Sequence, residues 1–224
     1  MHAIQIDGKP IDFASRGLFI DFDGTLCDSL GALRSAYYAF LRGFGVAGSE
    51  AEFEEMKGPP LPVIAATLAV RHGLPGSHAA LTAHYLEMAR AAHAAAGPAD
   101  GAGEVLHAAM QRGWRRAVVT SSPRVSVEAW LAREGLADLV DFIVGGDDVL
   151  HGKPDPEPYR HALSLSGCDP LASLAIEDAP LGAEAALGAG LPTRLIGTAA
   201  PPEIAANPLF AGFLPRFSAL ALIL

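Results

Sequence analysis

The chain has few of the residues that mark a disulfide-rich, nucleic-acid-binding or membrane-spanning protein. It has 2 cysteines, Cys27 and Cys168, far apart and without histidines at metal-ligand spacing, so neither a disulfide framework nor a zinc site is expected. A net charge of −9 leaves no basic face for nucleic acid. No run approaches the roughly 18 apolar residues of a membrane span. We therefore expect a globular protein with no nucleic-acid partner, no membrane partner and no obligate protein partner.

The sequence also shows no apolar segment at its start, and it contains few lysines. The first residues, MHAIQIDGKPIDF, contain charges and no apolar core segment, so no signal peptide is expected. Together with the reducing compartment that two separated cysteines favour, this predicts a cytoplasmic protein. The 3 lysines are Lys9, Lys57 and Lys153, so a lysine inside a motif is informative.

Short apolar runs alternate with helical patterns along most of the chain. The runs are typical of buried parallel strands and lie at residues 18–22, 117–120, 142–144, 174–176 and 194–196. The helical patterns lie at residues 103–112, 123–134, 156–166 and 181–189. This alternation predicts an α/β protein in which helices cover both faces of a parallel sheet.

Residues 29–97 interrupt the alternation with helix signals and no strand. Ser29, Ser49 and Ser77 are each placed to cap a helix, and a further helical pattern covers residues 62–72. We predict a helical cap domain over residues 29–97, inserted after the first strand of a core domain made of residues 17–28 and 98–224. Residues 1–16 form an N-terminal extension, in which the turn at Asp7 and Gly8 favours a β-hairpin.

Two carboxylates follow the first predicted strand, in the run DFDGTL at residues 21–26. Residues two apart on a strand point to the same side, so Asp21 and Asp23 would project into one site. Open α/β sheets bind ligands at this end of their strands. Gly24 would let the backbone turn sharply. The alternative interpretation is an Asp-Gly turn with incidental charge.

Three later runs place polar groups at the ends of strands or in a rigid loop. VVTSS, at residues 118–122, puts Thr120 and Ser121 before a helix, as an anion site or as an ordinary helix cap. GKPDPEPY, at residues 152–159, presents Lys153 rigidly, either to neutralise a phosphoryl group or to hold two carboxylates together. The alternative is a solvated loop lysine. Glu177 and Asp178 end a further strand, and carboxylates gathered at strand ends suit Mg²⁺.

These runs, with IEDAPLGAEAALGAG at residues 176–190, resemble the four motifs of the haloacid dehalogenase superfamily, and more narrowly of its phosphatase branch with a helical cap. The resemblance covers roughly residues 17–220. It implies a Rossmann-like three-layer α/β/α sandwich with a parallel sheet, a small all-helical cap after the first core strand, and Mg²⁺ as the cofactor.

The resemblance also implies roles for individual residues. The catalytic pair would be Asp21 as nucleophile and Asp23 as general acid and base. The phosphate-binding groups would be Thr120, Ser121, Lys153 and the backbone at Gly24. The metal would be held by Asp21, the Asp23 carbonyl, Glu177 and Asp178. Ala179 departs from the many relatives that carry Ser or Thr there, so a hydrogen bond beside the metal would be missing.

The implied activity is Mg²⁺-dependent hydrolysis of a small phosphorylated metabolite through an aspartyl-phosphate. The loop at Lys57 and Gly58 resembles the cap substrate loop of phosphoglycolate-phosphatase-like proteins, some of which act on nucleotides.

Several alternatives stay open. A mutase similar to β-phosphoglucomutase would carry arginine where Leu61 stands. A 2-haloacid dehalogenase would lack Asp23 and need no metal. A phosphonate hydrolase would need a Schiff-base lysine in the cap, and Lys57 is a poor match. A non-enzymatic binding protein would be expected to have lost some of the charged set.

Overall fold

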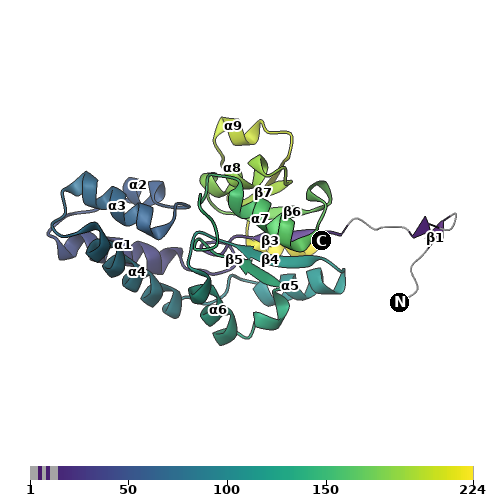
Figure 1. Cartoon of the computed structure of the whole chain (residues 1–224), viewed down its shortest axis with the longest axis horizontal. Coiled ribbons are helices and arrows are strands. Elements are labelled where there is room, and N and C mark those ends of the chain that lie inside the picture. The colour runs from purple at the N-terminus through teal and green to yellow at the C-terminus, as the bar shows by residue number, and fades with distance from the viewer. Residues whose placement is uncertain (1–4, 7–8, 11–14, 224) are drawn as a thin grey trace.

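The structure is a computed structural model, and it describes residues 5–6, 9–10 and 15–223. A parallel six-stranded sheet with the order β5-β4-β3-β6-β7-β8 lies at its centre (Figure 1). The strands are β3 (Gly17–Ile20), β4 (Arg115–Val119), β5 (Phe142–Val144), β6 (Leu174–Glu177), β7 (Thr193–Ile196) and β8 (Phe210–Leu214). The predicted α/β class is confirmed, and all five predicted strands are present. β8 was not predicted, because this edge strand is mostly only half-buried and is interrupted by Gly212.

Helices cover both faces of the sheet and make three layers. The first face is covered by α5 (Ala102–Gln111) and α6 (Arg124–Arg133), and the second by α7 (Glu157–Ser166) and α8 (Pro180–Gly188). The alternation of a β-strand explains both layers, because Leu18 and Ile20 pack on the first face while Phe19 packs on the second. The short helix α9 (Pro202–Ala205) lies beyond β7 in the chain.

Three short 3₁₀ helices complete the core, at Ala137–Leu139, Pro170–Ala172 and Phe217–Leu222. In the last of these, Phe217 and Leu220 are buried against the first face. The apolar C-terminal run therefore packs on the core as a 3₁₀ helix.

A second group of helices lies to one side of the sheet (Figure 1). We call it the helical insertion, residues 30–95. It consists of α1 (Leu30–Gly43), α2 (Glu50–Glu55), α3 (Leu61–His72) and α4 (His78–Ala95). The helices pack around a separate hydrophobic cluster that includes Phe40, Leu68 and Leu81. The described residues of the helical insertion include no strand, as the sequence predicts.

Two of the three predicted serine caps are present. Ser49 accepts a hydrogen bond from the Glu52 backbone N–H, and Ser77 accepts one from the Ala80 backbone N–H, both at 3.2 Å. The prediction for Ser29 is wrong, because its side chain makes no capping bond. The backbone of Ser29 is helical (φ −94°, ψ −15°), whereas a capping residue is extended, and the Ser29 hydroxyl donates to Asp23 Oδ1 at 2.6 Å.

The two connections between the core and the helical insertion are hydrogen-bonded to each other. The Asp28 N–H donates to the Gly97 carbonyl at 3.0 Å, and the Ala99 N–H donates to the Leu26 carbonyl at 2.9 Å. Cys27 and Pro98 form an antiparallel bridge between these two bonds. The chain thus enters and leaves the helical insertion through one short paired ribbon.

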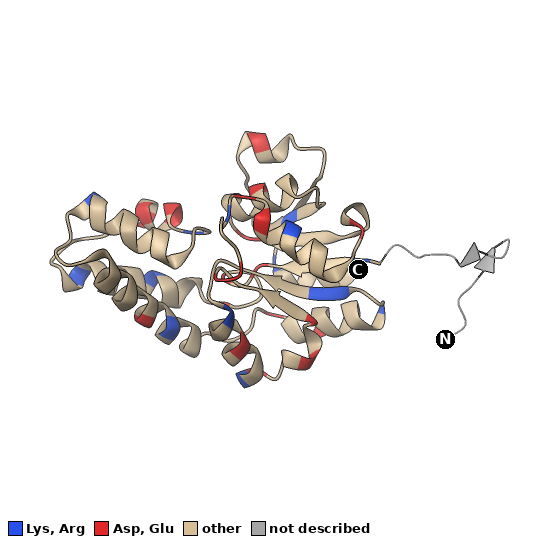
Figure 2. Ribbon diagram, viewed as in Figure 1, with Lys and Arg blue, Asp and Glu red and all other residues tan. Residues whose placement is uncertain are grey.

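The N-terminal extension contributes two short strands, β1 (Gln5–Ile6) and β2 (Lys9–Pro10), which pair antiparallel. The predicted turn at Asp7 and Gly8 lies outside the described residues. None of the helices in the described part of the chain combines the length and the apolar character that a bilayer span requires. Lys and Arg are scattered over separate elements of the described part of the chain (Figure 2).

Candidate active site

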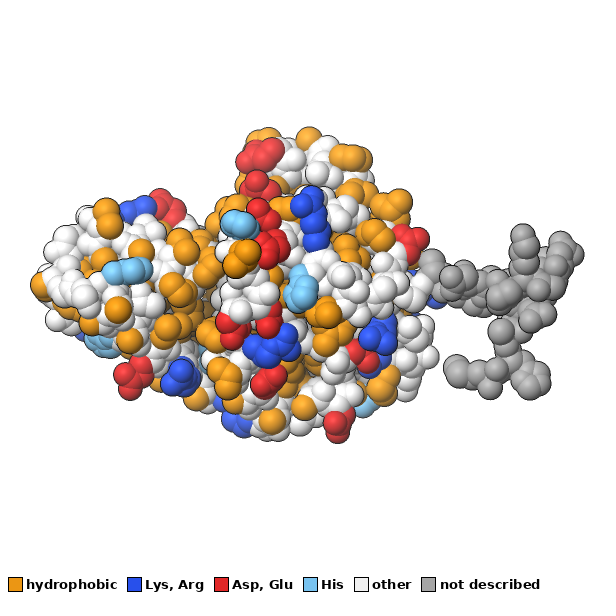
Figure 3. Space-filling view, viewed as in Figure 1, with side chains coloured by type: hydrophobic (Ala, Val, Ile, Leu, Met, Phe, Trp, Pro, Cys, Tyr) orange, Lys and Arg blue, Asp and Glu red, His pale blue; other side chains and the backbone are white. Residues whose placement is uncertain are grey.

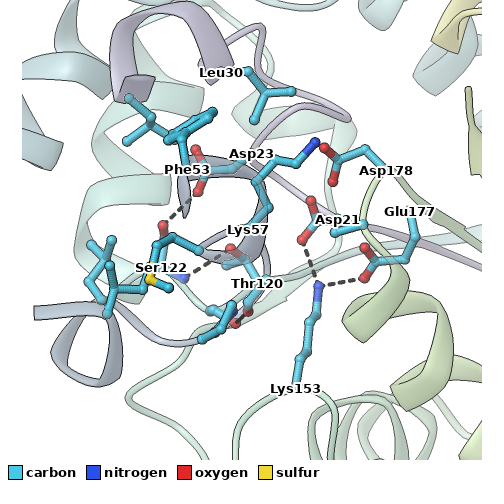
Figure 4. Close-up of a pocket in the computed structure, with 18 of the residues that line it drawn as sticks. Asp21, Asp23, Leu30, Phe53, Lys57, Thr120, Ser122, Lys153, Glu177 and Asp178 are labelled. Atoms are coloured by element: carbon cyan, nitrogen blue, oxygen red, sulfur yellow. Dashed lines mark hydrogen bonds and ion pairs between the residues drawn. The ribbon is translucent and has the colours of Figure 1, made fainter. Parts of the chain in front are cut away.

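The predicted functional residues gather in one cavity between the carboxyl ends of the sheet strands and the helical insertion (Figure 4). Asp21 follows β3, Thr120 follows β4 and Glu177 ends β6, and these three strands are neighbours in the sheet. Parallel strands bring such residues to one edge, whatever their separation in sequence. Lys153 reaches the same place from the loop after β5.

Lys153 holds two of the carboxylates together. Its ammonium group donates to Asp21 Oδ1 at 2.6 Å, to Glu177 Oε1 at 2.5 Å and to the Val119 carbonyl at 3.0 Å. Burial disfavours the charged ammonium, but the charges of Asp21 and Glu177 outweigh that effect and raise the pKa of Lys153. The lysine is therefore cationic at neutral pH, and the solvated alternative considered for it does not describe this buried side chain.

Tyr159 fixes the far side of this group. Its hydroxyl donates to Glu177 Oε1 at 2.5 Å, and its ring lies 5.4 Å from the Lys153 ammonium. Burial and the charge of Glu177 raise the pKa of Tyr159 well above its ordinary value, so it remains a neutral donor. Glu177 thus has one oxygen occupied by Lys153 and Tyr159, and both partners orient it.

Asp21, Glu177 and Asp178 form a candidate metal centre. One carboxylate oxygen from each lies within 4.8 Å of the other two. Burial and the charge of Glu177 raise the pKa of Asp21 despite the opposing charge of Lys153, and they raise the pKa of Asp178 to about 7. Carboxylates that disfavour one another's ionisation in this way, with oxygen donors only, suit a hard divalent cation. The donor set therefore fits Mg²⁺.

Asp23 points to a different set of partners. Its Oδ1 accepts from Ser29 at 2.6 Å and from His93 Nε2 at 2.7 Å, and its Oδ2 accepts from Ser122 at 2.8 Å. Burial alone would raise the pKa of Asp23, but the charge of His93 and these hydrogen bonds lower it. Asp23 lines the same cavity as Asp21, with a separate set of hydrogen-bond donors.

Two glycines allow backbone to approach the acidic groups closely. Gly24 has φ +81°, and a Cβ there would lie 2.4 Å from Asp178 Oδ2. A Cβ on Gly182, at the start of α8, would lie 2.1 Å from Glu177 Oε2. The Gly24 N–H donates to the Cys27 carbonyl at 2.9 Å. The role of Gly24 in phosphate binding stays a prediction. The space that its missing side chain leaves for Asp178 is observed.

The hydroxyl groups after β4 already have partners within the protein. Thr120 Oγ1 accepts from the Ser122 N–H at 3.0 Å, and its hydrogen remains available for an incoming oxygen. The Ser121 hydroxyl donates to the Gly58 carbonyl at 2.6 Å. This bond joins the core to the predicted substrate loop of the helical insertion.

That loop lies over the acidic group. Gly58 has φ +103°, and a Cβ there would lie 3.1 Å from Leu181 and 3.8 Å from Ala179. The Lys57 ammonium lies 2.6 Å from Glu54 Oε2 and is directed toward Asp178 (Figure 4). Every predicted site residue except Gly24 thus lines the cavity, and Gly24 lies against Asp178.

Sequence reasoning missed His93, Ser122 and Tyr159 as members of the site. His93 lies on α4, 70 residues from Asp23 along the chain, and its ring packs edge-on against Phe22 at 5.3 Å between centroids. Ser122 belongs to the VVTSS run, and its hydroxyl could have been considered beside its neighbours. For Tyr159, the available signal was its place at the end of GKPDPEPY, in the first turn of α7.

Comparison with known proteins gives a consistent result. Residues 18–196 match the family described as haloacid dehalogenase-like hydrolase. Validoxylamine A 7'-phosphate phosphatase of Streptomyces hygroscopicus subsp. limoneus is 33% identical over 187 residues, which cover 76% of this chain and 80% of that protein. A phosphoglycolate phosphatase of Rhodospirillum rubrum is 33% identical over 186 residues, which cover 79% of this chain and 77% of its own.

A solved structure shares the fold. CbbY from Rhodobacter sphaeroides, in complex with phosphate, superposes with a TM-score of 0.75 at 24% sequence identity. The match covers 94% of this chain and 100% of that one. At this identity the likeness concerns the fold, and it extends over both the sheet and the helical insertion.

Proposed function

The chain belongs to the haloacid dehalogenase-like hydrolases, and we propose that this phosphatase hydrolyses a small phosphorylated metabolite with Mg²⁺ through an aspartyl-phosphate on Asp21. The observation that carries the proposal is the contact of Lys153 with both Asp21 and Glu177 beside the Asp21, Glu177 and Asp178 oxygens. A buried nucleophilic carboxylate needs such neighbouring positive charge to receive a phosphate dianion.

The first chemical step is assigned to Asp21. One of its oxygens attacks phosphorus in line, the bond from phosphorus to the leaving oxygen breaks, and the phosphoryl group passes to Asp21. Lys153 holds Oδ1, so Oδ1 and Oδ2 of Asp21 are not equivalent. A leaving alkoxide requires a proton, and Asp23, in the same cavity, supplies it from its protonated form. The charge of the bound phosphate favours that form, because it raises the pKa of Asp23 from the lowered value of the free protein.

The second step returns the enzyme to its starting state. Water attacks the phosphorus of the aspartyl-phosphate, Asp23 accepts the proton of that water, and the bond from Asp21 to phosphorus breaks to release inorganic phosphate. Ser29, His93 and Ser122 keep the Asp23 carboxylate oriented during both proton transfers.

Binding of the phosphoryl group falls to Lys153, Thr120 and Ser121. Ser121 is available once its hydrogen bond to the Gly58 carbonyl opens. Mg²⁺, held by Asp21, Glu177, Asp178 and the Asp23 carbonyl, would offset the repulsion between the carboxylates and the phosphate.

We further propose that the predicted domain division is functional. Residues 17–28 and 98–224 form the catalytic core domain, and residues 29–97 form a cap domain that excludes water during reaction. The hydrogen bond from Ser121 to Gly58 supports this division, because it joins the phosphate-binding loop to the predicted substrate loop. The cytoplasm is the proposed compartment, since both cysteines are free thiols.

A single assay separates this proposal from its class alternatives. Purified protein with Mg²⁺ and p-nitrophenyl phosphate should release nitrophenol and phosphate in equal amounts. A dehalogenase or a binding protein would release neither at a rate above the background.

The mutase alternative requires a separate test. A mutase must hold a second phosphate while the first is transferred, which calls for a fixed cation facing the nucleophile. In the substrate loop, Pro59 and Leu61 line the cavity and cannot bind a dianion. The assay supplies β-glucose 1-phosphate with a trace of the bisphosphate and follows glucose 6-phosphate and phosphate. Isomerisation faster than phosphate release would overturn the hydrolase assignment.

A further inference from the structure

We propose that the organic part of the substrate is neutral and largely apolar, and carries neither a carboxylate nor a second phosphate. This inference rests on the proposed phosphatase function and specifies its substrate class. It concerns the wall of the cavity that lies opposite the catalytic carboxylates.

The helical insertion supplies that wall almost entirely from apolar side chains. These residues line the cavity: Leu30 and Leu33 from α1, Phe53 and Met56 at α2, and Leu61 and Ile64 from α3. Figure 3 shows hydrophobic side chains gathered where the helical insertion faces the core. A neutral apolar group gains free energy when it leaves water for such a surface, whereas a carboxylate loses its hydration without a partner.

The cations of the cavity are already paired. Among the described residues that line it, the positively charged ones are Lys57 and Lys153. Lys153 lies between Asp21 and Glu177 and serves the phosphoryl group. Lys57 is paired with Glu54 at 2.6 Å, and its charge also acts on Asp178. A second anionic group on the substrate would therefore meet no unpaired cation on this wall.

Tyr85 gives the wall one polar group, and that group is neutral. Tyr85 lines the cavity from α4, and burial raises its pKa to about 12. The phenol can therefore donate one hydrogen bond to an oxygen of the substrate, but it supplies no positive charge to offset that of an anion. The wall thus fits an uncharged moiety with at most a few polar atoms.

The first experiment compares two matched pairs of substrates with wild-type protein and Mg²⁺. Ethyl phosphate is paired with 2-phosphoglycolate, and phenyl phosphate with 4-carboxyphenyl phosphate, so that each pair differs by one carboxylate. We expect kcat/KM to be at least about tenfold higher for the neutral member of each pair, because the carboxylate must be desolvated without a partner. An equal or higher kcat/KM for the carboxylated member of either pair would overturn the proposal. Failure of the proposed function would look different, because no phosphate would be released from these four compounds or from p-nitrophenyl phosphate.

A second experiment places a cation in the wall. Leu61→Lys adds an ammonium at the start of α3, where Leu61 lines the cavity and is only half-buried. We expect it to shift the ratio of kcat/KM toward the carboxylated member by at least about tenfold. Val70→Lys, on the same helix but 85% exposed and outside the cavity, is the matched control and should leave the ratio unchanged.

The outcome has to be interpretable if one variant does not fold. Leu33→Lys, from α1, offers a second position on the same wall. Circular dichroism establishes that each variant is folded. A folded Leu61→Lys or Leu33→Lys protein with the wild-type ratio would contradict the proposal.

A third experiment tests whether Lys57 interacts with Glu54 and Asp178 or binds an anionic group of the substrate. Lys57→Ala should raise KM more than it lowers kcat, and by the same factor for both members of a pair, because its charge acts near the phosphoryl site. A rise in KM confined to the carboxylated substrates would show that Lys57 binds a substrate anion and would overturn the proposal.

Discussion

The core and the helical insertion contribute opposite kinds of surface to one cavity. On the core side, Lys153 lies within 2.6 Å of oxygens from Asp21 and Glu177, and all three side chains are at least nine-tenths buried. On the insertion side, the wall consists of residues such as Phe53 and Ile64. Buried charges need several fixed partners, which neighbouring strand ends provide. Apolar walls need only shape, which helices can supply and vary.

One residue of the helical insertion is an exception to this contrast between a charged core side and an apolar insertion side. His93 belongs to α4 of the helical insertion, yet its Nε2 donates to Asp23 at the end of β3. The remaining ring nitrogen, Nδ1, is buried without a hydrogen-bond partner among the described residues. The helical insertion therefore contributes to orienting Asp23, the proposed general acid and base, as well as to the apolar wall of the cavity.

The largest effect is expected from a substitution that removes a charge on the core side of the cavity. Asp21→Asn keeps the shape of the side chain but not its nucleophilic oxygen, so turnover should fall by more than about a hundredfold. Lys153 keeps its contact with Glu177, and thermal unfolding should show an intact fold. Retention of more than about a hundredth of the wild-type rate would contradict catalysis through Asp21.

Metal removal tests the same region without a mutation. EDTA should abolish phosphate release and Mg²⁺ should restore it, because the Asp21, Glu177 and Asp178 carboxylates repel the substrate dianion. Ca²⁺ should be a poor substitute, since it accepts looser coordination than octahedral Mg²⁺. In the protein without substrate, Mg²⁺ should also raise the unfolding temperature. Full activity in EDTA would instead favour the dehalogenase alternative.

His93 offers a test of the exception. Hydrogen bonds to charged groups contribute about 1.5–3 kcal/mol, so His93→Leu should lower kcat by roughly ten- to a hundredfold with little change in KM. His93→Gln keeps a donor and should recover part of the loss. His84→Gln, at an exposed position of the same helix, is the control and should behave like wild type. Equal kcat values for His93→Leu and wild type would show that the helical insertion has no part in proton transfer.

The smallest expected effect concerns a buried charge inside the helical insertion. Burial would raise the pKa of Glu52, but hydrogen bonds from Tyr37, His72 and Arg71 lower it below its ordinary value of 4.5. The ionised form therefore stabilises the fold above pH 4.5, and this contribution is lost as the pH falls through the lowered pKa.

Glu52→Gln should accordingly reduce the free energy of unfolding by about 1–2 kcal/mol at pH 7. The difference from wild type should narrow below about pH 4, as the wild-type carboxylate becomes protonated. Glu55→Gln removes an exposed partner of Arg71 and should cost less than about 0.5 kcal/mol. Urea unfolding at several pH values measures both. A difference independent of pH would contradict the assigned role of the Glu52 charge.

The same contrast explains how much the sequence could predict. The core strands were predictable because buried parallel strands are short apolar runs, and the polar groups that end them follow directly in the sequence. Asp21, Lys153 and Glu177 could therefore be predicted from short runs of sequence alone. The contact of Asp23 with His93 depends on how α4 packs beside the loop after β3, and no local sequence pattern encodes that packing.

Backbone conformation accounts for a further difference. Ser29 has the sequence of a helix cap, but its backbone is helical and its hydroxyl donates to Asp23. The Gly24 N–H donates to the Cys27 carbonyl within a tight turn, and the assignment of Gly24 to phosphate stays a prediction. The apolar wall was not predicted because its members also look like ordinary core residues of amphipathic helices.

The paired ribbon at Cys27 and Pro98 has a consequence for the history and engineering of this chain. Because the polypeptide enters and leaves the helical insertion at hydrogen-bonded neighbours, the two ends of the core lie side by side there. An insertion whose ends meet can be replaced by another without rethreading the sheet. A different helical segment could therefore be joined at residues 28 and 97 without changing the order of the sheet strands, and the residues that the sheet contributes to the cavity would keep their places.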